Sequence, residues 1–275
     1  KYIHYRMHPQ NAACLTTAKI DITLLANNHV LDWGYEGLAE TLSTLEQAGI
    51  KAAGSGRDIR AASQPAIIDL KDKGRVIVSA WAHASSGVPP KWAATNNRPG
   101  VNRLDNLNPD AVQHISNRIN TVKQAGDIAV VSIHWGGNWG YDIPDWQLEF
   151  AHRLIDTASV DVVHGHSSHH AKGIEVYKGK LIIYGSGDLL NDYEGIGGHE
   201  EYRADLSLMY FPSLDPSTGE LVQLKMKPTQ IRHLRINSAG EIDALWLKDM
   251  LNREGRELGT RVRLDSDNSL VLEWE

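Results

Sequence analysis

Side chains that can bind a divalent metal follow three separate apolar segments of the chain. Asn28 and His29 come directly after one segment, His134 after another, and His166 and His169 after a third. In layered α/β folds the loops at one edge of a sheet converge, so such side chains can meet in space. Imidazole nitrogen and amide oxygen suit Zn²⁺, Mn²⁺ or Fe²⁺. A metal held there would activate water and polarise a phosphoryl or carbonyl oxygen, which predicts hydrolytic chemistry.

Each of these side chains also has a purely structural explanation. Asn28 fits a turn, because asparagine tolerates the left-handed region and bonds its own backbone. His29 could brace the helix that follows, and His134 could be a single histidine satisfied at a strand end. His152, on a predicted helix, is assigned to packing or to the surface. The segment 164–170 is harder to explain by structure alone, because it places four imidazoles within seven residues.

Apolar periodicity places these residues on alternating strands and helices. Buried strands are predicted over 21–26, 127–133 and 160–163, each leading into one of the polar turns. Hairpins are predicted for 66–81 and 173–184. The remaining predictions are helices over 34–48, 108–125 and 242–253 and from Pro144, a long loop over 85–102, and strands over 204–211, 221–227 and 230–236. With no repeat or linker, the sequence predicts one α/β domain over 1–275, a mixed sheet covered by helices.

Composition narrows the class of protein. A hydrophobic fraction of 41% and a charged fraction of 23% are ordinary for a soluble globular chain. The net charge of −6, without a basic block, argues against nucleic acid or an anionic membrane as the main partner. Cys14 is the single cysteine, which excludes an intrachain disulfide and thiolate zinc sites, and we expect it to be a small buried apolar residue.

Targeting signals are not visible in the sequence. No stretch approaches the roughly 18 to 20 apolar residues of a membrane-spanning helix. Residues 1–6 have no initiator Met and no apolar signal-peptide core, so we expect the chain to begin inside a longer gene product. The residues leave the compartment open, with the cytoplasm favoured over the cell envelope.

Several motifs surround the candidate residues in a fixed order. They are Ala26-Asn27-Asn28-His29 with Asp32 and Gly34, then Gly54-Ser55-Gly56, His134-Trp135-Gly136, Gly165-His166-Ser167-Ser168-His169 and Tyr184-Gly185-Ser186-Gly187-Asp188. Over roughly residues 15 to 195 this order resembles the CapA family of poly-γ-glutamate synthesis proteins. CapA-like domains belong with the calcineurin-like metallophosphoesterases.

The resemblance implies a four-layer α/β/β/α sandwich of metallophosphoesterase type with mixed sheets and a two-metal site. By that likeness Asn28 is a metal ligand, and His29 contacts the reacting group as an acid or transition-state stabiliser. His134 and His166 would ligate one metal, and His169 would reach the other. Two ions of Mn, Zn or Fe could then hold a bridging hydroxide for in-line attack.

Three departures from the family pattern qualify this expectation. Metallophosphoesterases usually have an acidic residue directly after the Asn-His pair, where this chain has Val30; Asp32, as in CapA relatives, is expected to orient His29 instead. The last motif is commonly Gly-His-x-His, and the two serines here leave open whether His169 or His170 points inward, with His169 favoured. Nothing near the start matches the family's first acidic strands. We therefore expect the chain to lack them, and to bind metal weakly and hydrolyse poorly unless another chain completes it.

The substrate side of the pocket has weaker candidates. Asp188 and Asn191 could contribute to a pocket wall, and Trp135 and Trp139 could form an apolar wall for substrate.

Three functions compete at this point. The first is a metal-dependent hydrolase acting on a phosphoester or a related ester or amide. The second is a non-catalytic component that binds a polyanionic polymer such as poly-γ-glutamate, or a membrane synthase complex. The third is a histidine-rich domain with incidental metal affinity, which we rank last because the motifs occur in the family's order.

Overall fold

Strands and helices alternate along the first half of the chain, whereas antiparallel strands dominate the second half. The computed structural model describes residues 3–71, 73–191 and 196–275. Its contacts divide the chain into two compact units, which we call the first unit (Lys1–Trp135 and Asp156–Val160) and the second unit (Gly136–Ile155 and Asp161–Glu275). The expectation of one domain over 1–275 stays a prediction.

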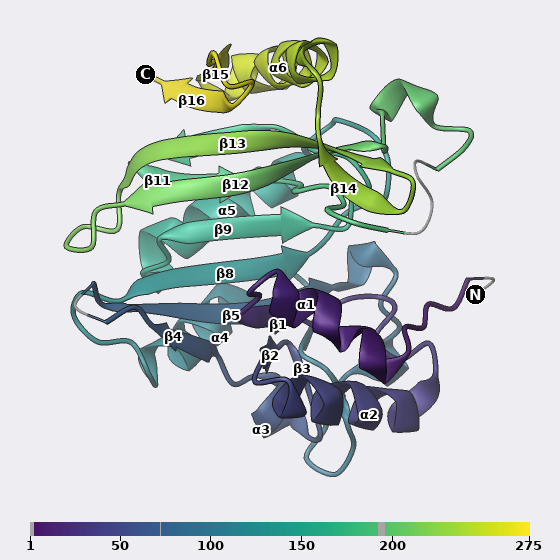
Figure 1. Ribbon diagram of the computed structural model, residues 1–275. Helices are drawn as coiled ribbons and strands as arrows, with labels where there is room; N and C mark the ends of the chain where they lie inside the picture. Colours follow the sequence, from purple (N-terminus) through teal and green to yellow (C-terminus); the bar gives the residue numbers. More distant parts are fainter. Residues whose placement is uncertain (1–2, 72, 192–195) are drawn as a thin grey trace. The chain divides into compact units, whose positions relative to one another are not determined.

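The first unit contains short parallel and antiparallel strand pairs joined by helices (Figure 1). Strand β1 pairs in parallel with β2, and β3 pairs antiparallel with β6. Strand β5 forms a hairpin with β4 and pairs in parallel with β7 and β8. These strands are β1 (Ile22–Leu24), β2 (Lys51–Ala53), β3 (Ser55–Gly56), β4 (Ala66–Asp69), β5 (Arg75–His83), β6 (Gly100–Val101), β7 (Arg103–Leu104) and β8 (Ile128–His134).

The helices of the first unit follow from the apolar spacing and from local end signals. They are α1 (Ala13–Thr17), α2 (Gly34–Gln47), α3 (Ile59–Ala62) and α4 (Pro109–Asn120), with 3-10 turns at Pro9–Ala12, Ala84–Ser86 and Pro90–Trp92. Helix α2 buries Leu38 and Leu45 on one face and ends ahead of Gly49, whose φ of 73° favours glycine. Asn108 caps the start of helix α4, because its side chain accepts a hydrogen bond from the backbone N–H of Ala111.

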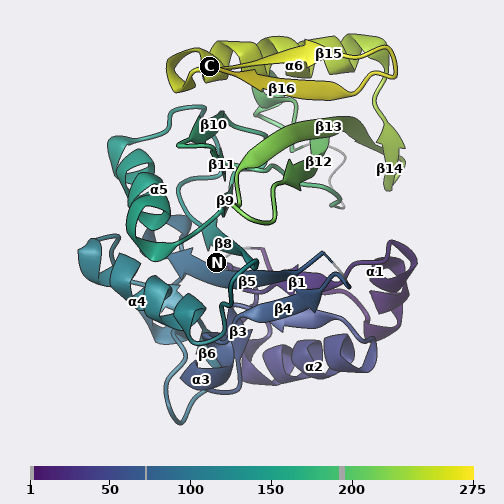
Figure 2. The same cartoon turned by 90° about the vertical axis from the view of Figure 1, so that its left-hand side faces the viewer.

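The second unit combines a mixed strand group with a larger antiparallel sheet. Strand β11 pairs antiparallel with β10 and in parallel with β9. The sheet has the order β12-β13-β16-β15, with β14 paired to β13, and α6 lies along β15 and β16 (Figure 2). These elements are α5 (Asp145–Ala158), which ends in the first unit, β9 (Val162–His166), β10 (Ile174–Tyr177), β11 (Lys180–Ile183), β12 (Leu206–Leu214), β13 (Leu221–Arg232), β14 (Arg235–Ser238), α6 (Glu241–Gly255), β15 (Thr260–Leu264) and β16 (Leu270–Trp274), with 3-10 turns at Glu200–Tyr202 and Arg256–Leu258.

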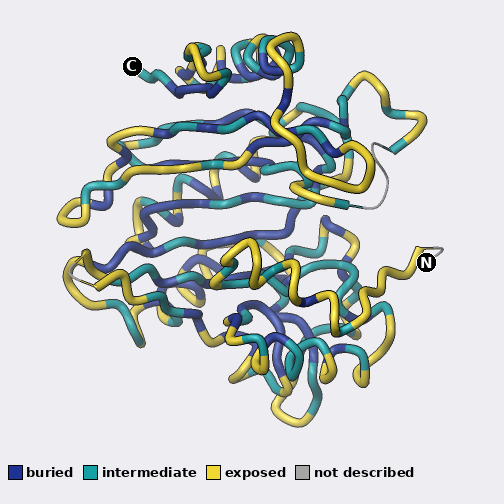
Figure 3. The backbone as a smooth tube through the Cα atoms, in the orientation of Figure 1, coloured by how far each residue is buried: buried dark blue, intermediate teal, exposed yellow. Residues whose placement is uncertain are grey.

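Buried residues concentrate on the strands, and the helices alternate between buried and more exposed residues (Figure 3). In the first unit the apolar cluster includes Ala26, Leu38, Ala80 and Val101. Together with the parallel and antiparallel pairs, this core confirms the expected mixed α/β architecture. Within the described residues, no helix combines the length and apolar character required to cross a membrane.

Several local predictions are wrong. Cys14 is exposed, because α1 buries none of its residues. The two strands predicted on either side of Pro228 are one strand, Leu221–Arg232, in which the Pro228 carbonyl accepts a hydrogen bond from the backbone N–H of Ala239 at 3.1 Å. The helix predicted to reach Ala125 ends at Asn120. Asp72, in the first predicted hairpin, lies outside the described residues.

Candidate active site

The loop after β1 holds His29 in one orientation. The Asn27 side chain accepts the backbone N–H of His29 at 2.8 Å, which shapes the turn. The Nδ1 atom of His29 lies 2.6 Å from Oδ2 of Asp32, whose side chain is only 1% exposed. Because a carboxylate only accepts, Nδ1 of His29 donates this hydrogen bond, which fixes the orientation of the ring. This is the hydrogen bond that the expected orienting role of Asp32 requires.

The other candidates of the first unit, His134 and Asn28, lie beside β5 and beside the segment that follows it. His134 is the last residue of β8, pairs in register with Ala82 of β5 and is buried. Asn28 lies against Gly87 in the segment after β5, where a Cβ on that glycine would be 3.7 Å from the Asn28 amide nitrogen. Sequence reasoning missed His83, the last residue of β5, although it too ends a buried strand. Burial lowers the pKa of His83, so the neutral imidazole is favoured.

The second-unit histidines begin on β9, which extends to His166 rather than ending at Val163. The rings of His164 and His166 lie 5.4 Å apart on the same face of the strand. Burial lowers the pKa of His164 to about 4, which keeps its imidazole neutral at pH 7. Ser167 follows with a φ of 128°, a conformation that non-glycine residues rarely adopt and that concentrates at functional sites.

A second histidine–carboxylate pair lies in the next turn of this loop. The Nδ1 atom of His169 is 2.7 Å from Oδ2 of Asp188, which also accepts a hydrogen bond from the Asn191 amide at 2.8 Å. The ring of Trp139 lies 5.4 Å from the His169 ring, centroid to centroid. Asp188 therefore supports His169 directly, and Asn191 supports it through Asp188. Trp135, predicted with Trp139 as an apolar wall for substrate, is buried in the first unit.

His170, the alternative to His169, has a different environment. It is 1% exposed, its Nδ1 atom bonds the backbone carbonyl of Ala171 at 3.0 Å, and its ring stacks on Tyr202 at 4.6 Å. Burial lowers the pKa of His170 to about 4. The partly exposed His169 with its carboxylate is thus better suited to meet a ligand than the buried His170.

His152 has the packing role expected of it. Its Nε2 atom bonds the carboxylate of Glu175 at 2.9 Å, and its ring stacks on Tyr177 at 3.8 Å.

The individual side chains are of the types that bind divalent metals. The Nδ1–H of His169 donates a hydrogen bond to the Asp188 carboxylate. Metal-binding histidines commonly make such a bond with the ring nitrogen that does not bind the metal. Across residues 3–71, 73–191 and 196–275, no three His, Cys, Asp or Glu side chains form a group that could hold a metal. The ligand roles of Asn28, His134, His166 and His169 therefore stay predictions.

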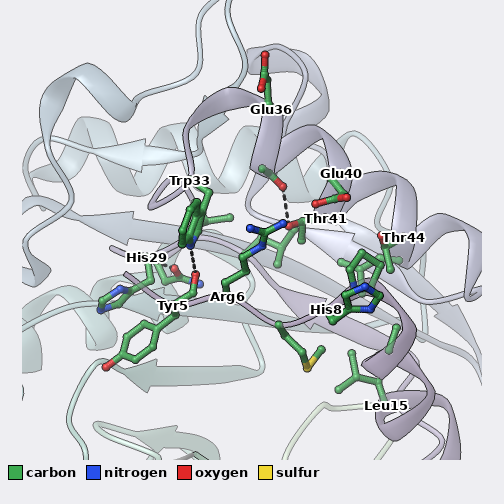
Figure 4. A pocket seen from close by; sticks show the side chains of 18 residues that line it. Tyr5, Arg6, His8, Leu15, His29, Trp33, Glu36, Glu40, Thr41 and Thr44 are labelled. Atoms are coloured by element: carbon green, nitrogen blue, oxygen red, sulfur yellow. Dashed lines mark hydrogen bonds between the residues drawn. The ribbon is translucent and has the colours of Figure 1, made fainter. Parts of the chain in front are cut away.

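A pocket of about 650 Å³ opens beside His29, within the first unit (Figure 4). One wall is α2, which contributes Glu40 and Thr41, and the other is the segment from Tyr5 to Leu15. Its volume lies in the usual range for small-molecule sites.

Comparisons with known proteins agree with the order of the motifs. The model of the family described as bacterial capsule synthesis protein PGA_cap matches residues 1–193. A relative from Mycobacterium tuberculosis, described as a probable polyglutamine synthesis accessory protein, is 46% identical over 273 residues, covering 99% of this chain and 72% of the relative.

Two Bacillus relatives match a shorter part of the chain. The PGA biosynthesis protein CapA of Bacillus subtilis is 30% identical over 192 residues, covering 70% of this chain and 48% of the relative. The capsule biosynthesis protein CapA of Bacillus anthracis is 26% identical over 197 residues, covering 70% of this chain and 45% of the relative. This chain therefore belongs to the bacterial capsule synthesis family that includes the CapA proteins.

Proposed function

We propose that this chain is a metal-dependent hydrolase in poly-glutamate or capsule synthesis, acting on a phosphoester or a γ-glutamyl linkage. The proposal includes two divalent ions of Mn, Zn or Fe and the four-layer α/β/β/α sandwich of the metallophosphoesterases. It also includes partners in a synthase complex and, as the favoured compartment, the cytoplasm.

One observation carries the proposal: two histidines, each held at Nδ1 by an aspartate, follow different strands. His29 with Asp32 follows β1, and His169 with Asp188 follows β9. Such a carboxylate fixes the tautomer and aims Nε2, which structural packing alone does not require. Ser167, in the His169 loop, adds a strained backbone of the kind that functional sites retain.

The chemistry that follows uses the two imidazoles differently. His29, 29% exposed at its side chain and oriented by Asp32, acts in its imidazolium form. It keeps the Nδ1–H on Asp32 and transfers the Nε2 proton to the leaving oxygen or nitrogen, which converts it to the neutral imidazole. His169 has the bonding pattern of a metal ligand. A bound metal would supply activated water and charge stabilisation.

The test is metal analysis of the purified protein together with turnover of a phosphodiester and a γ-glutamyl substrate panel. His134→Ala and His166→Ala should each lose bound metal and activity together, by about 100-fold or more in kcat. His152→Ala is a matched control, because His152 pairs with Glu175 and should affect neither. If either ligand variant keeps both metal and activity, the assignment of its histidine is wrong.

A second function is favoured by the description of the mycobacterial relatives as accessory proteins. In that case the chain would bind the polymer or a synthase component without catalysis. Metal-loaded protein that turns over no substrate in the panel, yet binds poly-γ-glutamate, would support this function instead.

A further inference from the structure

A segment near the start of the chain, which runs into the 3-10 turn Pro9–Ala12, lies across the loop that carries His29 (Figure 4). We call residues 3–12 the N-terminal strap. Tyr5 makes three contacts with the loop: its backbone N–H donates to Oδ2 of Asp32 at 3.0 Å, its carbonyl accepts the Trp33 indole N–H at 2.9 Å, and its ring centroid lies 4.1 Å from that of His29. Nothing in the sequence pattern predicted these contacts.

The Tyr5 backbone and His29 share one oxygen atom. Oδ2 of Asp32 accepts both the Tyr5 N–H and the His29 Nδ1–H, and the Asp32 side chain is 1% exposed. Undocking the strap would remove one donor from a buried carboxylate and one aromatic face from the imidazole. The orientation of His29 is therefore coupled to docking of the strap.

The strap also forms one wall of the pocket beside His29. Arg6 places its guanidinium 5.0 Å from the centre of the Trp33 ring, and Met7, His8 and Pro9 continue the wall. The opposite wall is α2. A ligand in this pocket would touch the strap and His29 at once, so its binding would favour the docked strap.

We propose that Tyr5 is a positioning residue for His29, and that the N-terminal strap completes the substrate pocket when Tyr5 is docked. The inference rests on the proposed hydrolytic role of His29. Tyr5 acts through Asp32 and His29, and it has no chemical step of its own.

Four variants separate the contributions of Tyr5. Tyr5→Ala removes the ring and keeps the backbone N–H, whereas Tyr5→Pro removes both the ring and the N–H that donates to Asp32, so the difference between these two variants reports the N–H. Tyr5→Phe keeps both the ring and the backbone contacts. Tyr35→Ala is a matched control, because Tyr35 is an exposed tyrosine of α2 that does not line the pocket.

Two measurements report strap docking without any substrate. Exchange of the Trp33 indole N–H with water, followed by NMR, should accelerate about tenfold or more in Tyr5→Ala and Tyr5→Pro. The ¹⁵N shifts of the His29 ring, measured where the imidazole is neutral, should change from one dominant tautomer to an average of two. Tyr5→Phe and Tyr35→Ala should match the unmodified protein in both.

Kinetics then test the positioning role. On any substrate that the protein turns over, Tyr5→Ala and Tyr5→Pro should lower kcat about tenfold or more, with a smaller change in KM, and Tyr5→Phe should restore kcat. The inference is overturned if the Trp33 indole N–H exchanges freely in the unmodified protein. It is also overturned if the strap undocks while the His29 tautomer and kcat stay unchanged. An unmodified protein without turnover would contradict the proposed hydrolase, and the two NMR measurements would still decide whether Tyr5 positions His29.

Discussion

Replacing Asp32 by asparagine tests the orientation of His29 with the smallest change in shape. In the native chain Oδ2 of Asp32 accepts from His29 Nδ1 at 2.6 Å and from the Tyr5 N–H at 3.0 Å, and the side chain is 1% exposed. The amide of Asp32→Asn must present either its NH₂ group or its neutral oxygen to these donors. The first orientation sets donors against donors, so the amide oxygen will occupy the Oδ2 position.

The structure sets the size of the expected effect. Hydrogen bonds to charged groups contribute about 1.5–3 kcal/mol and neutral ones about 0.5–1.5 kcal/mol, so weakening two bonds costs about 2–3 kcal/mol. Part of that cost appears as lower stability of the first unit. The other part, about 1–1.5 kcal/mol, appears as imidazole disorder, which should lower kcat about tenfold.

The assay is hydrolysis of bis(p-nitrophenyl) phosphate with Mn²⁺ supplied, alongside urea unfolding of the same samples. Asp21→Asn is the control, because Asp21 is an exposed aspartate just ahead of β1 and should change neither quantity. A folded Asp32→Asn protein with kcat within about twofold of the unmodified value would refute the orienting role of Asp32.

Three further predictions concern the scaffold of the first unit. Leu38→Ala, at a fully buried position of α2, should lower the free energy of unfolding by about 2–5 kcal/mol in urea titrations, because it leaves a cavity in the core. Gly54→Ala should lower the melting temperature and cost about 2 kcal/mol or more. Its φ is 93°, and a Cβ there would lie 2.5 Å from the Cβ of Ala26, just ahead of the Asn-Asn-His loop. Hydrogen bonds from Arg75 at 2.6 and 3.0 Å hold the pKa of Asp127 below its usual value. The resulting stabilisation is fully present above about pH 3.9 and is lost as the pH falls through the lower pKa of the folded state. In Asp127→Asn, the free energy of unfolding measured in urea should therefore depend less on pH at acid pH.

Much of the local structure could be predicted from short stretches of sequence. The apolar spacing that includes Leu38 and Leu45, followed by Gly49, predicted α2 close to its observed ends. The apolar run before His134 predicted β8 in the same way. These features depend on neighbours within a few residues, so periodicity and end signals are enough to reveal them. The order of the motifs likewise indicated the family that the comparisons show.

Contacts between residues that are far apart in the sequence could not be predicted from local patterns. Asp188 is 19 residues from His169, and Tyr5 is 24 residues before His29, yet each forms a direct contact with its histidine. Which carboxylate, ring or backbone amide comes within hydrogen-bonding distance depends on the packing of whole elements, because neither residue type nor spacing encodes it. The sequence alone determined which residues could do chemistry, the strands that carry them and the nearby partner Asp32 of His29. Only the tertiary structure decided that the distant residues Asp188 and Tyr5 contact His169 and His29.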